Sequence, residues 1–201
     1  MNKLQDTIEQ IKTLEKELLV ELQKKEEDFF YKIREGKVYF DAEVRKRHKA
    51  QAVGIIRYIL GAKPINVVTM PVIWLCVIPA VLLDAVVSIY HAVCFRAYGI
   101  PMVVRSDYIV IDRQSLGYLN VIEKLNCIYC GYFNGLMAYV QEVAARTEQY
   151  WCPVKHARNL QTIHSRYQHF IEYGDSQRYS ENLEKVRRDF HDLENNTNAR
   201  N

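Results

Sequence analysis

The stretch that decides the fold is the apolar run from Ile65 to Phe95, which reads INVVTMPVIWLCVIPAVLLDAVVSIYHAVCF. It contains one charged residue, Asp84. A helix needs about 20 apolar residues to cross a hydrocarbon core, and a soluble domain rarely needs so long an apolar segment. The run therefore predicts a membrane segment, which we place at residues 64–98.

Two membrane topologies fit this run. In the first, one tilted helix crosses the bilayer. In the second, a hairpin centred on Pro79 dips in and returns, because a proline removes a backbone donor and bends or breaks a helix. Cations lie on both flanks, Lys63 before the run and Arg96 and Arg105 after it, so the positive-inside rule does not decide between them. We favour the hairpin, since both ends would then lie in the cytoplasm, where cysteines stay reduced. A buried helical hairpin in a soluble protein is the competing interpretation.

Asp84 has two interpretations of its own. An acid at membrane depth is costly and often functional, so Asp84 is a candidate intramembrane functional acid. Alternatively, it lies near the interface or forms a structural pair with Arg96 or Arg105.

The N-terminal region alternates apolar and charged residues at helical spacing. Between residues 4 and 29 this pattern predicts an amphipathic, coiled-coil-like helix, which either packs on its own domain or binds a partner helix or a second copy. A basic cluster follows before the apolar run, where it would attract anionic lipid headgroups. Its cations are Arg45, Lys46, Arg47 and Lys49.

Four residues further along the chain have the spacing of metal ligands. Cys127 and Cys130 form a C-x2-C pair, and Cys152 and His156 form a C-P-x-x-H pair. Thiolate and imidazole donors in this number suit tetrahedral zinc, so the pattern predicts a Cys3His site that is closed and structural. Iron or an iron–sulfur cluster is the alternative, and a redox-active dithiol at the first pair is another.

Glu142 and Glu148 lie between the two halves of this motif and are candidate second-shell partners that orient His156. The competing interpretation is that they form surface pairs, for example Glu142 with Arg146. The sequence has no glycine-rich phosphate loop and no G-x-S-x-G elbow, so whether the protein is an enzyme stays open. The net charge of +3 arises from interleaved acids and bases and argues against nucleic-acid binding.

The central and C-terminal sequence resembles a family of uncharacterised bacterial membrane-associated proteins. The resemblance covers roughly residues 64–179, and its most specific parts are N-C-x-Y-C at 126–130 and T-E-Q-Y-W-C-P-x-K-H-A at 147–157. It implies a bacterial source and a membrane context, hence the inner membrane. It implies no activity.

We therefore expect a mostly helical protein. Its predicted parts are a helical region at 1–63, a membrane segment at 64–98, a metal-binding helical region at 99–193 and a polar tail at 194–201. The predicted function is that of a membrane-attached binding or scaffold protein with structural zinc. The alternative is a membrane oxidoreductase or metalloenzyme that uses the cysteines with Asp84.

Overall fold

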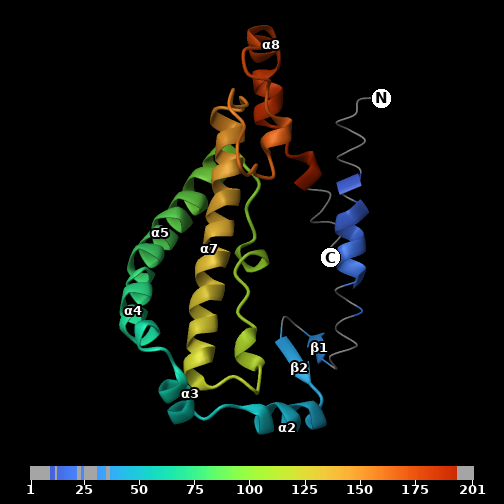
Figure 1. Ribbon diagram of the computed structural model, residues 1–201. Helices are drawn as coiled ribbons and strands as arrows, with labels where there is room; N and C mark the ends of the chain where they lie inside the picture. The colour runs from blue at the N-terminus through green and yellow to red at the C-terminus, as the bar shows by residue number, and fades with distance from the viewer. Residues whose placement is uncertain (1–9, 12, 22–23, 25–30, 35–36, 194–201) are drawn as a thin grey trace. The chain divides into compact units, whose positions relative to one another are not determined.

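The computed structural model describes residues 10–11, 13–21, 24, 31–34 and 37–193, and it is mostly helical, as predicted (Figure 1). The chain divides into two compact units. One comprises Met1–Ala62 with Asp112–Ile128, and the other comprises Lys63–Ile111 with Tyr129–Asn201.

The first unit opens with helical residues at 10–11, 13–21 and 24, which agrees with the predicted amphipathic helix; the rest of the range 4–29 lies outside the described residues. Apolar side chains on this helix are exposed, among them Ile11, Leu14 and Leu18. Nothing within the described residues covers this stripe, so a partner helix stays a prediction.

A β-hairpin follows, which the sequence analysis missed. Strand β1 (Tyr31–Arg34) pairs antiparallel with β2 (Lys37–Phe40), with Tyr31 opposite Phe40. The signal was present, because apolar and polar residues alternate on both sides of Gly36.

Two helices complete the N-terminal part of this unit, α2 (Ala42–Gln51) and α3 (Ile55–Gly61). Val44 is buried on α2, and the His48 ring lies 5.0 Å from that of Phe40 and 5.1 Å from that of Tyr118. The unit also contains a 3-10 turn, η3 (Arg113–Ser115), and the first residues of α7.

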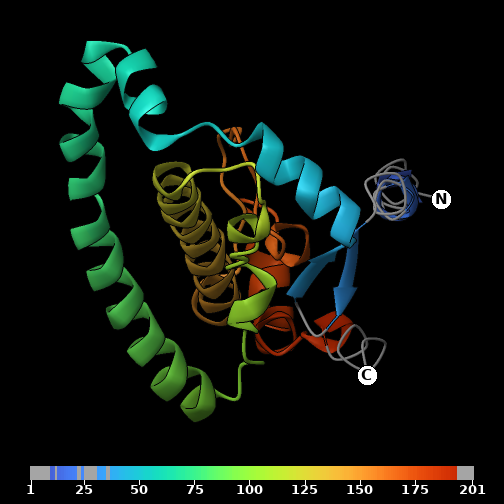
Figure 2. The ribbon, with the colours of Figure 1, turned by 90° about the horizontal axis from the view of Figure 1, so that it is seen from below.

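The apolar run forms one long helix in the second unit. It comprises α4 (Pro64–Leu75), α5 (Val77–Tyr90), a π-helical turn η1 (His91–Phe95) and α6 (Arg96–Tyr98). Together these span 35 residues, which by length and composition could cross a membrane. Figure 2 shows α4 and α5 as one continuous arc.

The predicted proline-centred hairpin is wrong, because α5 continues in the direction of α4 without reversing (Figure 2). The two helices join at Cys76, whose φ and ψ of −63° and −15° stay in the helical region. Pro79 has no N–H to donate to the Leu75 carbonyl, which explains the junction just before it. The proline therefore interrupts the hydrogen bonding of the helix without turning the chain back.

The core of the second unit lies between α5 and α7 (Val121–Trp151), together with the extended segment 99–111. This segment contains the 3-10 turn η2 (Arg105–Asp107) and no strand. The buried cluster is formed by Ala80, Phe95, Ile100, Val103, Leu136, Tyr139, Val143 and Phe190.

Two glycines on α7 allow the backbone of the extended segment to pack closely against the helix. A Cβ atom at Gly135 would lie 2.6 Å from the Tyr108 carbonyl oxygen and 2.8 Å from the Ile109 Cα, and one at Gly131 would lie 3.3 Å from the Val110 oxygen. The helix runs unbroken through both glycines for 31 residues, and the glycines make room for backbone.

Gly135→Ala is therefore expected to lower the free energy of unfolding by about 2 kcal/mol, since rigid backbone must move to accept the methyl group. Thermal and denaturant unfolding followed by circular dichroism measures this. Gly61→Ala is the matched control, because nothing lies within 4 Å of its added Cβ. Equal stability of the two variants would contradict the packing argument.

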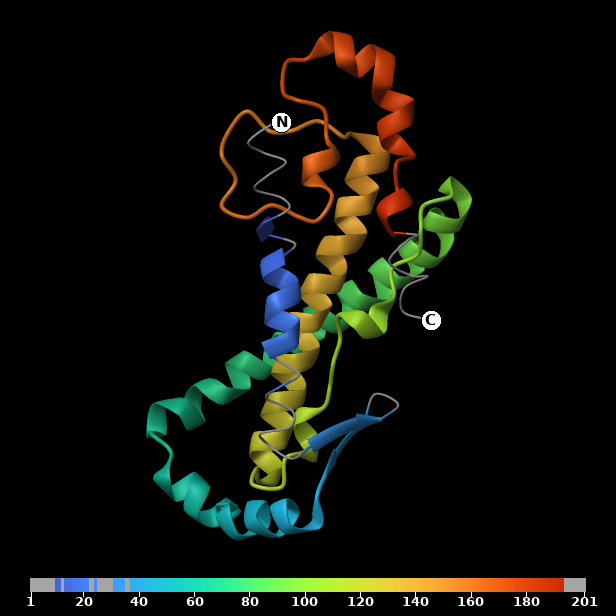
Figure 3. The same cartoon turned by 90° about the vertical axis from the view of Figure 1, so that its right-hand side faces the viewer.

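After Trp151 the chain is largely irregular as far as Asp175, and this described stretch contains no α-helix. Val154 and Ile171 form an isolated parallel bridge, and η4 (Tyr167–His169) is a single 3-10 turn. Helix α8 (Ser176–Arg187) then begins with the Asp175 carboxylate accepting from the Arg178 N–H at 2.9 Å. Figure 3 shows this C-terminal loop and α8 near the end of α7.

Candidate functional site

The four predicted metal ligands do not converge on one site. Cys127 and Cys130 lie in the first third of α7, and Cys152 follows its last residue. The 22 helical steps from Cys130 to Cys152 separate them by about 33 Å at 1.5 Å per residue. No group of three or more metal-binding side chains occurs among the residues that the structure describes. The structure therefore does not bring the predicted Cys3His ligands together within one chain, and a zinc, iron or iron–sulfur cofactor stays a prediction.

The C-P-x-x-H half of the motif has another structural role. Cys152 is exposed, and its N–H donates to the Glu148 carbonyl at the end of α7. Pro153 is buried and its carbonyl accepts from the Ile171 N–H at 2.8 Å. His156 stacks on the Tyr167 ring, and its N–H donates to the Tyr167 hydroxyl. The motif thus ends α7 and starts the bridge to residue 171.

Cys152→Ser should change the free energy of unfolding by less than about 0.5 kcal/mol, because the thiol is exposed and away from the core. Unfolding measured with and without a zinc chelator checks this. If the chelator destabilises the unchanged protein but leaves the variant unaffected, Cys152 holds a metal after all.

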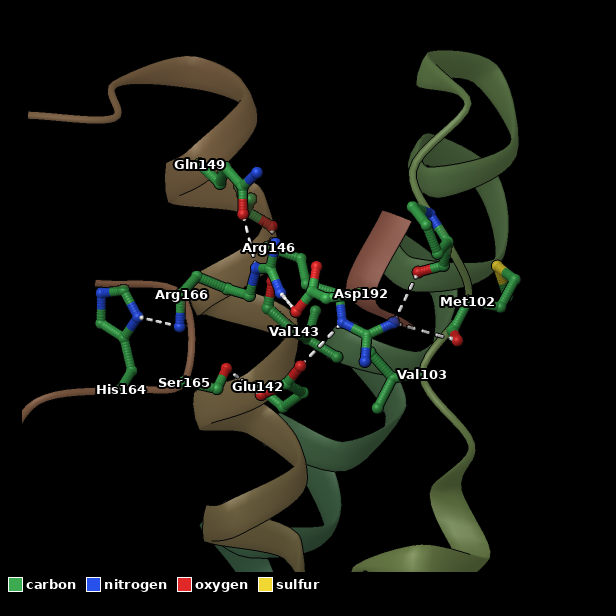
Figure 4. Close-up of polar contacts among 12 residues, drawn as sticks. Met102, Val103, Glu142, Val143, Arg146, Gln149, His164, Ser165, Arg166 and Asp192 are labelled. Atoms are coloured by element: carbon green, nitrogen blue, oxygen red, sulfur yellow. Dashed lines mark hydrogen bonds and ion pairs between the residues drawn. The ribbon is translucent and has the colours of Figure 1, made fainter. Parts of the chain in front are cut away.

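A buried polar network occupies the second half of α7 instead (Figure 4). Glu142 accepts from Arg146 Nε at 2.8 Å through Oε1 and from the Ser165 hydroxyl at 2.6 Å through Oε2. Arg146 also donates to the carbonyls of Pro101 and Met102, at 3.0 and 3.2 Å. Both carboxylate oxygens of Glu142 are engaged, so this acid ties three segments together. It does not orient His156, as the sequence analysis had considered.

Arg166 forms the centre of a second set of contacts and is 1% exposed. Its Nε donates to Gln149 Oε1 at 2.5 Å, and its terminal nitrogens donate to the Asp192 carboxylate at 2.6 Å and the Asp189 carbonyl at 2.8 Å. Gln149 donates in turn to the carbonyls of Val186 and Asp189. These contacts hold the segment after α8 against the end of α7.

Sequence reasoning found only part of this network. The four-residue spacing of Glu142 and Arg146 predicted a pair, although it was interpreted as a surface contact. Arg166 and Gln149 gave no signal, since a polar residue shows no periodicity that marks burial. Glu148, the other candidate second-shell acid, lies 3.1 Å from His164 Nε2 and not beside a metal.

Asp192 makes the network sensitive to acid. Burial by itself raises the pKa of Asp192, but the hydrogen bond and charge of Arg166, with His169 nearby, bring it below its ordinary value. A lowered pKa in the folded state gives stability that is present above the unfolded pKa near 4 and is lost as pH falls through the folded pKa. Unfolding between pH 3 and 6 should show this loss, and Asp192→Asn should flatten it. An unchanged profile in the variant would contradict this role.

A third cluster links α5, the extended segment and α7. Asp84 pairs with Arg105, and it accepts from the Tyr132 hydroxyl at 2.8 Å and the Ser88 hydroxyl at 3.2 Å. Of the two expected partners, Arg105 is the one that the structure places beside Asp84. A functional role for this acid stays a prediction.

His91 lies buried on the same side of the long helix. Its Nε2 accepts from the Val103 N–H at 2.9 Å, and its Nδ1 lies 3.1 Å from the Tyr139 hydroxyl. A ring nitrogen that accepts carries no proton, so this arrangement requires neutral His91, with the proton on Nδ1. The ring therefore fastens the extended segment to the helix.

Comparison with known protein families, curated proteins and solved structures found no match to this chain. The resemblance to bacterial membrane-associated proteins stays a prediction.

Proposed function

We propose that the protein is a membrane-attached binding or scaffold component, held on one face of a membrane by α4 and the outer side of α5. The observation that carries this proposal is the exposure of α4. None of its residues is buried, and most of its apolar side chains are exposed, with Ile65, Val68 and Val72 each more than 60% exposed.

Such a helix belongs in a hydrophobic surrounding. A helix that is apolar all round is found in a protein core or in a lipid phase, and α4 lies outside the described core. The residues from Pro64 to Leu83 carry no charge, so about 30 Å of helix presents an unbroken uncharged surface. Lipid is therefore the cover that we infer.

Helix α5 has a buried side and an exposed apolar side, and the exposed side extends the apolar surface of α4 along the chain. Its inner side packs into the core through Ala80 and Val87. Its outer side exposes Ile78, Leu82 and Ile89, each by more than 60%. One side therefore contacts protein and the other is available to lipid.

The return path of the chain supports attachment to one face rather than a crossing. The extended segment 99–111 runs back along α7 and exposes Arg105 and Asp107. Its Val110 carbonyl approaches Gly131, two residues from Tyr129, whose hydroxyl donates to the Ile73 carbonyl of α4 at 3.0 Å. The segment thus reaches the level of α4. A crossing would place exposed, non-helical backbone and charges in hydrocarbon, which bilayers do not tolerate.

We therefore propose that the ends of the chain lie on the same side, at the cytoplasmic face of a bacterial inner membrane. The test uses single cysteines at exposed positions, Lys16→Cys or Glu181→Cys, in a chain whose native cysteines are serine. A maleimide that cannot cross membranes is applied to intact and to opened cells. We expect both sites to react only after opening. Labelling of one site alone in intact cells would establish a crossing and overturn the proposal.

The binding role rests on the exposed stripe of the N-terminal helix. Ile11, Leu14 and Leu18 are three and four residues apart and each is at least half exposed. A partner helix or a second copy would cover them. Chemical cross-linking of the membrane-bound protein, with Leu14→Lys and Leu18→Lys as the disrupting changes, tests this part.

A further inference from the structure

We infer that α2 and α3 form an interfacial site for anionic phospholipid headgroups, in which the cations of α2 bind phosphates and the apolar side chains of α3 enter the headgroup layer. The inference rests on the proposed membrane attachment and names the lipid class that it selects.

Helix α2 is divided into a packed side and a cationic side. Val44 and His48, one helical turn apart, face the unit, and His48 packs between the rings of Phe40 and Tyr118. The cationic side exposes Arg45, Lys46, Arg47 and Lys49. In the described part of the chain none of these four forms an ion pair, so their charges are available to a partner.

Helix α3 is short, apolar and uncovered. It has no buried residue, and Ile56 and Leu60 are 76% and 81% exposed. Together with Arg57 they line an open hollow on its surface. Exposed aliphatic side chains with a cation among them suit the boundary between headgroups and acyl chains.

The chain connection keeps both helices near the membrane. Only Ala62 and Lys63 separate α3 from α4, a backbone reach of at most about 11 Å. If α4 is inserted, α3 cannot leave the interface. The cations are then held close to the anionic surface, where each of them strengthens binding severalfold. Nucleic acid also attracts cations, but it offers no environment for the apolar side chains of α3.

The test uses the full chain in nanodiscs of phosphatidylcholine, with and without phosphatidylglycerol. A fluorophore on Ala52→Cys, an exposed position between the two helices, reports depth through quenching by lipids that carry a nitroxide on the acyl chain. The background again lacks native cysteines. We expect quenching to rise severalfold with phosphatidylglycerol. It should fall back in 0.5 M salt, because the screening length then drops to roughly a few ångströms.

Charge variants separate the site from general attraction. Arg47→Gln with Lys49→Gln should raise the phosphatidylglycerol fraction needed for half-maximal quenching by on the order of tenfold. Lys185→Gln with Arg188→Gln, at the C-terminal end of α8, removes the same charges elsewhere and should leave this fraction unchanged. Equal quenching in both kinds of nanodisc, equal effects of the two variants, or reversal of the quenching by a short RNA would each overturn the inference. Failure of the unchanged chain to enter nanodiscs would instead overturn the attachment itself.

Discussion

Val68→Glu with Val72→Glu is expected to release the protein from membranes that retain the unchanged chain through a high-salt wash. Both side chains lie on α4 and are more than 60% exposed. A charge at the centre of an inserted helix costs roughly 2.5 kcal/mol or more, so two charges should weaken attachment by on the order of a thousandfold. Fractionation of cells followed by immunoblotting measures the share of protein left in the membrane.

Gln161→Glu with Gln177→Glu adds the same charge at exposed positions away from α4 and should leave the protein in the membrane fraction. Salt provides a second check, since it screens the cations of α2 and leaves apolar burial in place. If salt alone released the unchanged chain, or if the α4 variant stayed bound, a protein surface rather than lipid would cover α4.

Arg166→Met should lower the free energy of unfolding by about 3 kcal/mol, the largest loss that we expect for a single substitution in the second unit. The change leaves Gln149 Oε1 buried without its donor, which costs roughly 1–3 kcal/mol. It also removes the bond to Asp192 and the contact of the guanidinium with the Phe190 ring, at 5.3 Å from its centre. Because Asp192 is 46% exposed, little of the loss comes from stranding its charge.

Arg158→Met is the matched control, because Arg158 is an exposed arginine on the same C-terminal loop. We expect it to unfold like the unchanged protein. Hydrogen exchange locates the loss: Arg166→Met should increase exchange at residues 186–193 before it affects α5. A variant as stable as the control would mean that the buried network does not hold the C-terminal segment.

The spacing of apolar residues predicted the helices whose pattern lies within one continuous segment. The helical character of residues 64–98 and the N-terminal helix follow from apolar spacing, but the favoured hairpin at Pro79 was wrong. Helix α8 begins at Ser176 because Asp175 provides the cap. The hairpin of β1 and β2 was also readable from its alternating pattern, but the preceding helical spacing was extended over it.

The candidate site could not be predicted in the same way. A C-x2-C pair and a C-P-x-x-H pair have metal spacing only if the chain between them folds back. Here that chain stays helical, with Gly131 and Gly135 inside it. Glycine costs a helix about 1 kcal/mol relative to alanine, so the two glycines by themselves weaken this stretch as a helix. The close approach of Tyr108 and Ile109 to Gly135 supplies the compensating contact, and it comes from residues more than twenty positions away.

The sequence by itself determined that this protein has an uncharged apolar helix at α4, an exposed cationic helix before it and a mostly helical fold, because each follows from neighbouring residues. Only the tertiary structure decided that the cysteines lie apart, that Arg166 is buried and that Asp84 pairs with Arg105. These outcomes depend on which segments pack together across long stretches of chain. A rigid helix of 31 residues separates what the sequence spacing had seemed to join.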